Sequence, residues 1–192
     1  MAHPAVGQLD VLARLLADDL ERCRPKSLVV VGCATGNGFE HIDPTVTTRV
    51  VALDLNPTFL ALLASRHAAR LPGLQLLQSD FMMAPLPPDS ADLVHAALVL
   101  EYAAPRRAIL RMARWLRPGG TLSVVLQLPS ERAMPIGSTP FASLQALTSI
   151  MCLVDEDEVR AAADVAHLEL EDSNILPLPQ GKALLAQRYR RP

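Results

Sequence analysis

The sequence VVVGCATGNG occupies residues 29–38, and its three valines complete a continuous strand-like run that begins at Ser27. Because no polar residue alternates with the apolar ones from Ser27 to Val31, the run predicts a strand buried on both faces, as in a parallel sheet. Glycines follow where this strand ends and a helix is expected to begin. Open parallel sheets bind ligands at such points, and glycine lets the backbone approach a ligand closely. The stretch therefore predicts a ligand-binding α/β fold, with a tight turn that binds nothing as the alternative.

The spacing of these glycines excludes two common nucleotide sites. The dinucleotide-binding fingerprint has glycines at relative positions 1, 3 and 6, whereas this loop, counted from Gly32, has them at positions 1, 5 and 7. Ala34 and Asn37 occupy the two diagnostic positions. A Walker A loop ends in Gly-Lys followed by Ser or Thr, but Gly38 is followed by Phe39. The loop is therefore not typical of an NAD-dependent enzyme or of a nucleoside triphosphatase.

Helical and strand-like segments alternate along the chain, which predicts a largely parallel, doubly wound sheet. Leucines at helical spacing from Leu9 to Leu20 predict a first helix. Asn56 followed by Pro57 is typical of a helix start, and Pro118 with the two glycines after it is typical of a stop. We expect strands at Ser27–Val31, Arg49–Leu55, Leu74–Gln78, Asp92–Leu98, Thr121–Leu128, Leu168–Ile175 and Ala183–Tyr189, and further helices at Pro57–Leu71, Pro105–Leu116, Phe141–Met151 and Asp155–His167.

Length and composition favour one domain. The chain has 192 residues, of which 50% are hydrophobic, and a net charge of −2, a balance that excludes a disordered chain or a polycation. Within a single domain of residues 1–192 we expect an N-terminal helix in 1–26, a cofactor-binding core in 27–129, and a substrate-side loop, helices and closing strands in 130–192. The first ten residues lack the basic start of a signal peptide, and no apolar run is long enough to span a membrane. We therefore expect a cytoplasmic protein.

The three cysteines predict neither a disulfide framework nor a metal site. Cys23, Cys33 and Cys152 are widely spaced, and none belongs to a CxxC or CxxH pair. A reducing compartment fits this pattern best.

Two carboxylates follow successive strands. Asp54 ends the second predicted strand, 22 residues beyond Gly32, where a carboxylate can accept hydrogen bonds from both hydroxyls of a ribose. Asp80 ends the third, where a carboxylate can accept a hydrogen bond from an exocyclic amine and Phe81 can lie against a base ring. Aspartate is common in surface turns after strands, so each acid alone has a structural alternative. Their joint placement favours a nucleoside-binding edge.

Four stretches follow one another between Ser27 and about Pro129: VVVGCATGNG, VVALDLNP, LLQSDFMMAPLPPDSADLVHAALVLEY and LRPGGTLSVVLQLP. In order and spacing they resemble the motifs of the class I S-adenosylmethionine-dependent methyltransferases. The resemblance implies a Rossmann-like three-layer sandwich with a seven-stranded, mostly parallel sheet and one antiparallel strand. It also implies S-adenosylmethionine as the cofactor and a small molecule as the methyl acceptor.

The resemblance further implies which residues bind this cofactor. It places the methionine moiety at the glycine loop, the ribose after the second strand, the adenine after the third, and the sulfur that carries the methyl group beside the fourth. The residues concerned are Gly32, Cys33 and Gly36, then Asp54 and Leu55, then Asp80 and Phe81, and finally Ala96. Two positions depart from the family pattern. Val30 stands where the family has an acid, which removes a polar anchor, and Ala34 replaces a glycine.

The catalytic residue is left unassigned. Methyl transfer from a sulfonium is an in-line displacement, so alignment of nucleophile and methyl group supplies most of the catalysis. A hydroxyl acceptor would also benefit from a base, and Glu101, Tyr102 and His95, in or after the fourth strand, are the candidates. The alternatives are a packed strand histidine and ordinary loop residues.

The charge pattern bears on the partners. Five arginines share one face of the helix Pro105–Leu116 and its end: Arg106, Arg107, Arg111, Arg114 and Arg117. They could meet RNA or an acidic partner, but no aromatic residues are interleaved for base stacking, so a solvent-exposed outer face is the alternative. The acids from Asp155 to Glu158 are typical of a helix start. With net charge near zero, a small-molecule substrate is favoured over nucleic acid.

Other functions remain open at this point. The loop Pro129–Pro140 leaves the same sheet edge as the glycine loop and could form one wall of a substrate pocket. The protein could also form a homodimer. The alternatives to a small-molecule methyltransferase are a non-catalytic cofactor-binding or interaction protein with the same fold, and an RNA or protein methyltransferase.

Overall fold

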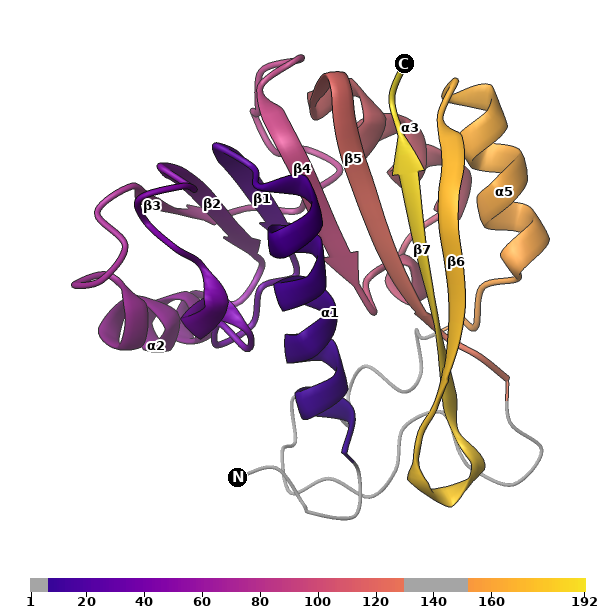
Figure 1. Cartoon of the computed structure of the whole chain (residues 1–192), viewed down its shortest axis with the longest axis horizontal. Coiled ribbons are helices and arrows are strands. Elements are labelled where there is room, and N and C mark those ends of the chain that lie inside the picture. Colours follow the sequence, from indigo (N-terminus) through magenta and orange to yellow (C-terminus); the bar gives the residue numbers. More distant parts are fainter. Residues whose placement is uncertain (1–6, 130–151) are drawn as a thin grey trace.

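A seven-stranded sheet forms the centre of the protein (Figure 1), as seen in a computed structural model that describes residues 7–129 and 152–192. The strand order is β3-β2-β1-β4-β5-β7-β6. β7 runs antiparallel to both of its neighbours, while the other pairs are parallel, which confirms the predicted doubly wound fold. The strands are β1 Ser27–Val31, β2 Arg49–Asp54, β3 Leu74–Gln78, β4 Ala91–Ala97, β5 Leu116–Gln127, β6 Glu169–Pro177 and β7 Ala183–Arg190.

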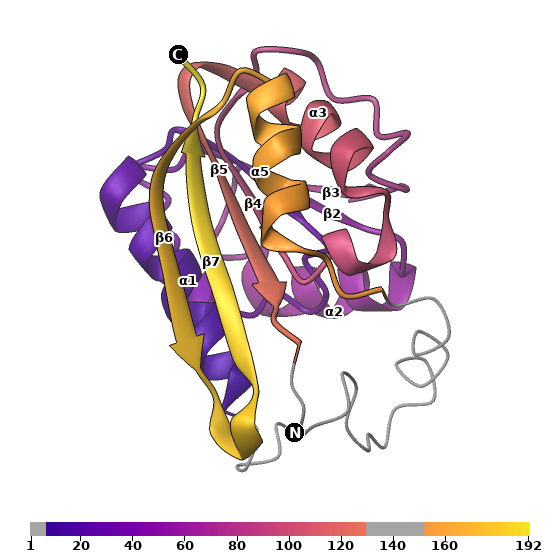
Figure 2. The same cartoon turned by 90° about the vertical axis from the view of Figure 1, so that its right-hand side faces the viewer.

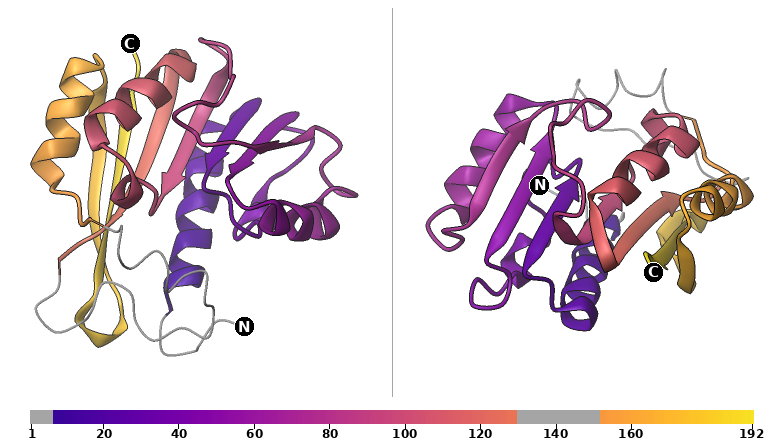
Figure 3. Two further views of the ribbon diagram at one scale, coloured as in Figure 1. Left: turned by 180° about the vertical axis from the view of Figure 1, so that it is seen from behind. Right: turned by 90° about the horizontal axis from the view of Figure 1, so that it is seen from above.

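Helices cover both faces of the sheet. α1 (Gln8–Cys23) and α2 (Pro57–His67) pack on one face, and α3 (Pro105–Trp115) and α5 (Glu156–Val165) pack on the other. Figure 2 shows α1 on one side of the sheet with α3 and α5 on the other, and the view from behind in Figure 3 shows the last two in front of the strands. The molecule therefore has the three layers that the sequence predicted.

β1 shows why the sequence folds in this way. Its apolar side chains alternate between the two faces: Val29 and Val31 join the core under α3 and α5, while Leu28 and Val30 join the core under α1 and α2. All four are at most 5% exposed. A strand buried on both faces needs apolar residues at every position, which is the pattern of this run.

The clearest differences from the predicted element boundaries are at the end of α2 and at the start of β5. α2 begins as expected, because the Asn56 side chain accepts a hydrogen bond from Thr58 N at 2.9 Å, but it ends at His67, before the predicted Leu71. β5 begins at Leu116, directly after α3. Pro118 and the two glycines after it therefore lie within the strand and do not form a separate loop between helix and strand. There Leu116 pairs with Ala91, and a register irregularity follows in β4. The predicted helix Phe141–Met151 lies outside the described residues, as does most of the loop Pro129–Pro140.

The largest difference concerns the connection from β1 to β2. A helix was expected after the glycines, but the structure has only one turn of 3-10 helix, η1, at Phe39–His41. Asp43 then turns the chain, accepting hydrogen bonds from the backbone N and the hydroxyl of Thr45 at 2.8 and 2.7 Å, and Pro44 cannot donate to a continuing helix. Phe39 is fully buried in the core under α1 and α2, where it takes part of the place of the expected helix.

Within the described ranges, no helix is long and apolar enough to cross a membrane.

Candidate cofactor site

The glycine loop begins at the carboxyl end of β1, where it is joined to β2. Gly32 N and Cys33 N both donate hydrogen bonds to Leu53 O, at 2.8 and 3.1 Å. Gly32 has a φ of 65°, and a Cβ at this position would lie 2.3 Å from Cγ1 of Val99. Only glycine fits such a conformation next to such a neighbour. The residue is solvent-exposed, so a ligand can approach its backbone closely.

Asp54 connects this loop to the start of α2. One carboxylate oxygen accepts a hydrogen bond from Ala34 N at 2.8 Å, and the other accepts one from Asn56 N at 2.8 Å. An ionised carboxylate has about four lone-pair sites, so two acceptor positions remain for further donors. Ala34 itself has a φ of 44°, a left-handed conformation that L residues other than glycine rarely adopt. Ala34 therefore adopts a conformation that glycine adopts without strain.

Cys33 and Gly36 continue the loop inward. Cys33 is 5% exposed and packs with the core under α1 and α2. Burial, together with the charge of Asp54, raises the pKa of the Cys33 thiol to about 12. The thiol is therefore protonated at neutral pH and does not act as a nucleophile. Gly36, with a φ of 82°, lies against the ring of His67.

Apolar side chains surround the carboxyl edge after β2, β3 and β4. Leu55 is 67% exposed, Met83 is 75% exposed and Tyr102 is 37% exposed. Large apolar side chains at solvent favour a binding surface when they gather around polar groups. Leu55 and Tyr102 were among the residues chosen from the sequence, whereas Met83 was missed because sequence alone does not reveal its exposure.

Asp80 and Phe81 follow β3 as predicted. Asp80 is exposed, and one of its oxygens accepts a hydrogen bond from Met82 N at 2.8 Å, which fixes the carboxylate in a turn. Phe81 is half-buried and packs against the core under α3. The structure thus brings an acid and an aromatic ring to the edge next to Asp54.

Ala96 lies deeper than the resemblance implied. It is fully buried within β4, between Val31 of β1 and Val124 of β5, so its side chain is part of the core. Its methyl group therefore does not line the surface of the edge. Leu98 and Val99 reach this edge instead, Leu98 with a φ of 57° and Val99 in contact with Gly32.

Glu101 is buried at the end of β4, within the 3-10 turn η2 (Leu100–Tyr102). It is 1% exposed; Oε1 accepts a hydrogen bond from Gln127 N at 2.8 Å, while Oε2 has no partner within the described structure. Burial raises the pKa of Glu101. Burial, and then the charge of Glu101, also raises the pKa of Tyr102. Two of the three candidate bases therefore lie together at the edge.

His95, the third candidate, is held in a buried polar cluster on the α1 side of the sheet. Its Nδ1 lies 2.8 Å from Oδ2 of Asp19, whose other oxygen accepts a hydrogen bond from Arg188 Nε at 2.5 Å. Burial opposes ionisation of Asp19, but the hydrogen bond and charge of His95, together with Ser123 and Arg188, outweigh it and lower the pKa of this carboxyl. These contacts join α1, β4 and β7, so the structure gives His95 an anchoring role. Val30, which pairs with His95 in the sheet, is buried among apolar residues.

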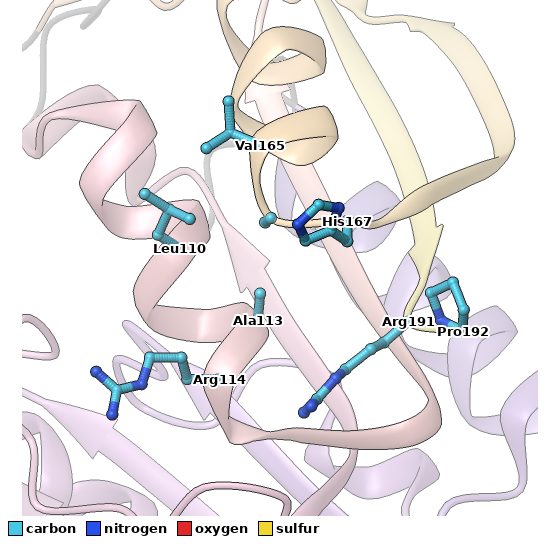
Figure 4. Close-up of a pocket in the computed structure, with 8 residues that line it drawn as sticks. Leu110, Ala113, Arg114, Val165, His167, Arg191 and Pro192 are labelled. Atoms are coloured by element: carbon cyan, nitrogen blue, oxygen red, sulfur yellow. The ribbon is translucent and has the colours of Figure 1, made fainter.

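A hollow of about 370 Å³ opens at the opposite edge of the sheet, between the ends of α3 and α5 (Figure 4). Its lining includes Leu110, Arg114, Val165, His167 and Arg191, and none of the described residues that line it is an acid that could bind ribose hydroxyls. It lies at the amino ends of the parallel strands, whereas open α/β sheets bind ligands at the carboxyl ends. The glycine loop and Asp54 therefore mark the candidate site, and this hollow does not.

Comparison with known proteins identifies the family of the chain. A family model described as a methyltransferase domain matches residues 29–124, half of the chain. Trans-aconitate 2-methyltransferase from Methylobacterium nodulans is 35% identical over 146 residues, which cover 70% of this chain and 54% of that protein. The chain thus spans about half the length of this curated relative.

Two solved structures are similar in fold. Geranyl diphosphate methyltransferase in complex with S-adenosylmethionine superposes with a TM-score of 0.75 at 14% identity, covering 95% of this chain and 85% of that one. The cyclase SpnF superposes with a TM-score of 0.71 at 17% identity, covering 95% and 81%. These likenesses concern the fold alone. The match over half of the chain shows that the protein belongs to the methyltransferase-domain family, within the class I S-adenosylmethionine-dependent methyltransferases.

Proposed function

We propose that the protein binds S-adenosylmethionine at the carboxyl ends of β1, β2 and β3 and transfers its methyl group to a small molecule. The observation that carries this proposal is the placement of Asp54. Its carboxylate closes the glycine loop through Ala34 N and still has acceptor positions for ribose hydroxyls. Gly32, exposed beside it, leaves space for the methionine part of the cofactor.

The remaining contacts suit an adenine nucleoside. The exposed Leu55 and the half-buried Phe81 offer apolar surface to the two sides of a base. Asp80 is fixed through one oxygen by Met82 N, which leaves the second oxygen for an exocyclic amine. The residues present therefore fit the cofactor, although Ala96 is too deeply buried to contact it and Val99 is better placed.

The chemistry requires alignment more than acid–base groups. When bound, S-adenosylmethionine supplies an electrophilic methyl group on a sulfonium. The chain's own residues would orient it and hold the acceptor in line. Glu101 is the candidate for taking a proton from the acceptor, because Oε1 is fixed by Gln127 N while Oε2 has no partner in the described part of the chain. Only its ionised form could do so, and because the side chain is 1% exposed the acceptor would have to reach into the edge. Tyr102, exposed beside it, would contact the acceptor.

A small acceptor is favoured over nucleic acid. Of the five arginines on and after α3, Arg111 donates to Ala84 O at 2.5 Å and lies over the ring of Trp115, and Arg117 pairs with Asp92. Two members of the basic face are therefore engaged within the fold. The trans-aconitate relative also carries the name of an enzyme that acts on a small molecule. We also propose that the protein forms a homodimer, which sedimentation analysis would test. A cytoplasmic location is likewise a proposal, and fractionation of cells would test it.

Calorimetry tests the proposal directly. Purified protein titrated with S-adenosylmethionine and with S-adenosylhomocysteine is expected to release heat and to melt at a higher temperature. Labelled cofactor offered with small carboxylates, phenols, thiols and amines, and separately with RNA, is expected to label a small molecule. Absence of binding would overturn the proposal, and label in RNA alone would overturn the acceptor class.

A second function is kept because of SpnF, a cyclase with the same fold. A chain that binds the cofactor without transferring its methyl group would show heat on binding but no labelled product with any acceptor. That outcome would replace methyl transfer by a cofactor-binding role.

A further inference from the structure

Three side chains at the end of α2 contact the connection from β1 to β2. Arg66 Nη1 donates hydrogen bonds to the carbonyl and the hydroxyl of Thr35, at 3.2 and 3.1 Å. Arg70, just beyond the helix, donates to Ile42 O at 2.5 Å and also to Phe39 O. Between them, the His67 ring packs on Gly36. We call Arg66, His67 and Arg70 the α2 clamp.

The clamp acts where the expected helix is missing. A full helix after the glycines would satisfy its own backbone groups and hold the loop rigid, but η1 comprises only three residues. The two arginines donate to carbonyls on both sides of this turn, at Thr35, Phe39 and Ile42. Backbone carbonyls that lack a helix partner require such donors or water. At Thr35 and Ile42 the arginines therefore supply hydrogen bonds that a helix would have made, whereas Phe39 O also accepts one from Ile42 N at 3.1 Å.

His67 fixes the close approach of the loop. A Cβ at Gly36 would lie 2.9 Å from Cδ2 and 3.0 Å from Nε2 of the imidazole, so the ring and the loop backbone are in direct contact. The His67 ring also lies 5.6 Å from the Phe39 ring at an angle of 44°. The loop is thus held against α2 by packing as well as by hydrogen bonds.

We propose that the α2 clamp consists of positioning residues, which hold the glycine loop in the shape that receives the cofactor. This inference rests on the proposed function, because the loop matters for binding only if it contacts the cofactor. The path from clamp to site is short: Arg66 holds Thr35, and the preceding residue, Ala34, donates its N–H to Asp54. A loose loop would have to be ordered when the ligand binds, and that ordering lowers affinity.

The experiment measures S-adenosylhomocysteine binding by calorimetry. The variants are Arg66→Lys, Arg70→Lys and the double variant, because lysine keeps the charge but lacks the guanidinium group. At Arg70 this removes the two Nη atoms that donate separately to Ile42 O and Phe39 O. Arg107→Lys is the matched control, since Arg107 is an exposed helix arginine with no hydrogen bond or ion pair found within the described ranges. Each protein is measured at a temperature where its melting curve shows it folded.

The double variant is expected to bind about tenfold more weakly, and the control to stay within about twofold of the unchanged protein. Thr35→Val removes one acceptor from the loop side without altering α2, and it is expected to weaken binding by about threefold. If the double variant melts earlier but binds as tightly as the unchanged protein, the clamp is structural and the inference is wrong. If the unchanged protein does not bind, the proposed function fails and the inference fails with it.

A pH series provides a second readout. Burial, followed by the charge of Arg70, lowers the pKa of His67, and the charge of Arg66 acts in the same direction. The charge of Glu40 and a hydrogen bond with the backbone of Gly36 oppose this shift without reversing it. Protonation of the ring would place a third positive charge between the two arginines. Affinity should therefore weaken as pH falls from about 7.5 to 5.5. His67→Gln should remove this dependence; an unchanged dependence would show that His67 does not act on the site.

Discussion

Asp54 accepts a hydrogen bond at 2.8 Å from the backbone N–H of Ala34, which lies in a different loop 20 residues earlier in the chain. The contact joins the acid after β2 to the only non-glycine residue of the glycine loop that has a positive φ. An acid placed in this way has two functions: it holds the loop, and it keeps acceptor positions for a ligand. Stability and affinity are therefore coupled at Asp54.

Asp54→Ala is expected to weaken S-adenosylhomocysteine binding by about 1 to 3 kcal/mol, the range for hydrogen bonds to a charged acceptor. It should also lower the melting temperature, because Ala34 N and Asn56 N both lose their partner. Calorimetry and thermal unfolding measure the two effects. The control is Asp43→Ala, which removes a similar turn contact with Thr45 outside the site. A control variant that lost as much affinity would show that Asp54 acts only through general stability.

Ala34→Gly is expected to raise the free energy of unfolding by up to about 1 kcal/mol, because glycine adopts a φ of 44° without strain. In a helix the same substitution is expected to have the opposite effect. Ala61→Gly, at an exposed position of α2, should lower the free energy of unfolding by about 1 kcal/mol. Urea unfolding of both variants measures the difference. Equal losses at both positions would show that the conformation of Ala34 is not strained.

Local patterns predicted much of the fold, while the roles of the candidate site residues stay predictions. Continuous apolar runs revealed the buried strands, and the acids that end β2 and β3 came to the expected edge because parallel strands end together. Contacts between distant segments were not predictable. Asp19 meets His95 across 76 residues, and Arg66 meets Thr35 across 31, so no local spacing encodes them. The depth of Ala96 was missed for the same reason, since it depends on how far β5 extends beside β4.

Glu101→Gln is expected to stabilise the protein and to impair methyl transfer. Burial raises the pKa of Glu101, so the folded chain holds this proton to a higher pH than the unfolded chain does. The folded state therefore loses stability as pH rises from the pKa of Glu101 in the unfolded chain to its higher pKa in the folded chain. Glutamine does not ionise and so removes this loss, and its side-chain oxygen can still accept the hydrogen bond from Gln127 N. We expect a gain of about 1 to 2 kcal/mol at neutral pH.

Turnover with an identified acceptor completes the test of Glu101. Removing a proton acceptor should lower kcat by about a hundredfold and flatten the acid side of the pH profile. Glu158→Gln, at an exposed position of α5, serves as the control for loss of a carboxylate. A Glu101→Gln protein that is more stable and fully active would show that the acid has no part in transfer.

The buried cluster of Asp19, His95 and Arg188 is expected to govern acid unfolding. The pKa of Asp19 is lowered in the fold, since the contacts with His95 and Arg188 outweigh its burial. The unfolded chain therefore binds more protons than the folded one in the range below the ordinary pKa, and stability is lost as pH falls through the folded pKa. Asp19→Asn removes the buried carboxylate that His95 and Arg188 share, while Arg188 keeps Asp172 at 2.6 Å, and should cost about 1 to 3 kcal/mol at neutral pH. It should also remove part of the steep loss of stability in acid.

Asp18→Asn is the matched control, because Asp18 lies 3.4 Å from the same guanidinium but is largely exposed. Urea unfolding at several pH values measures both effects, and equal curves for the two variants would show that burial of the Asp19 pair contributes nothing.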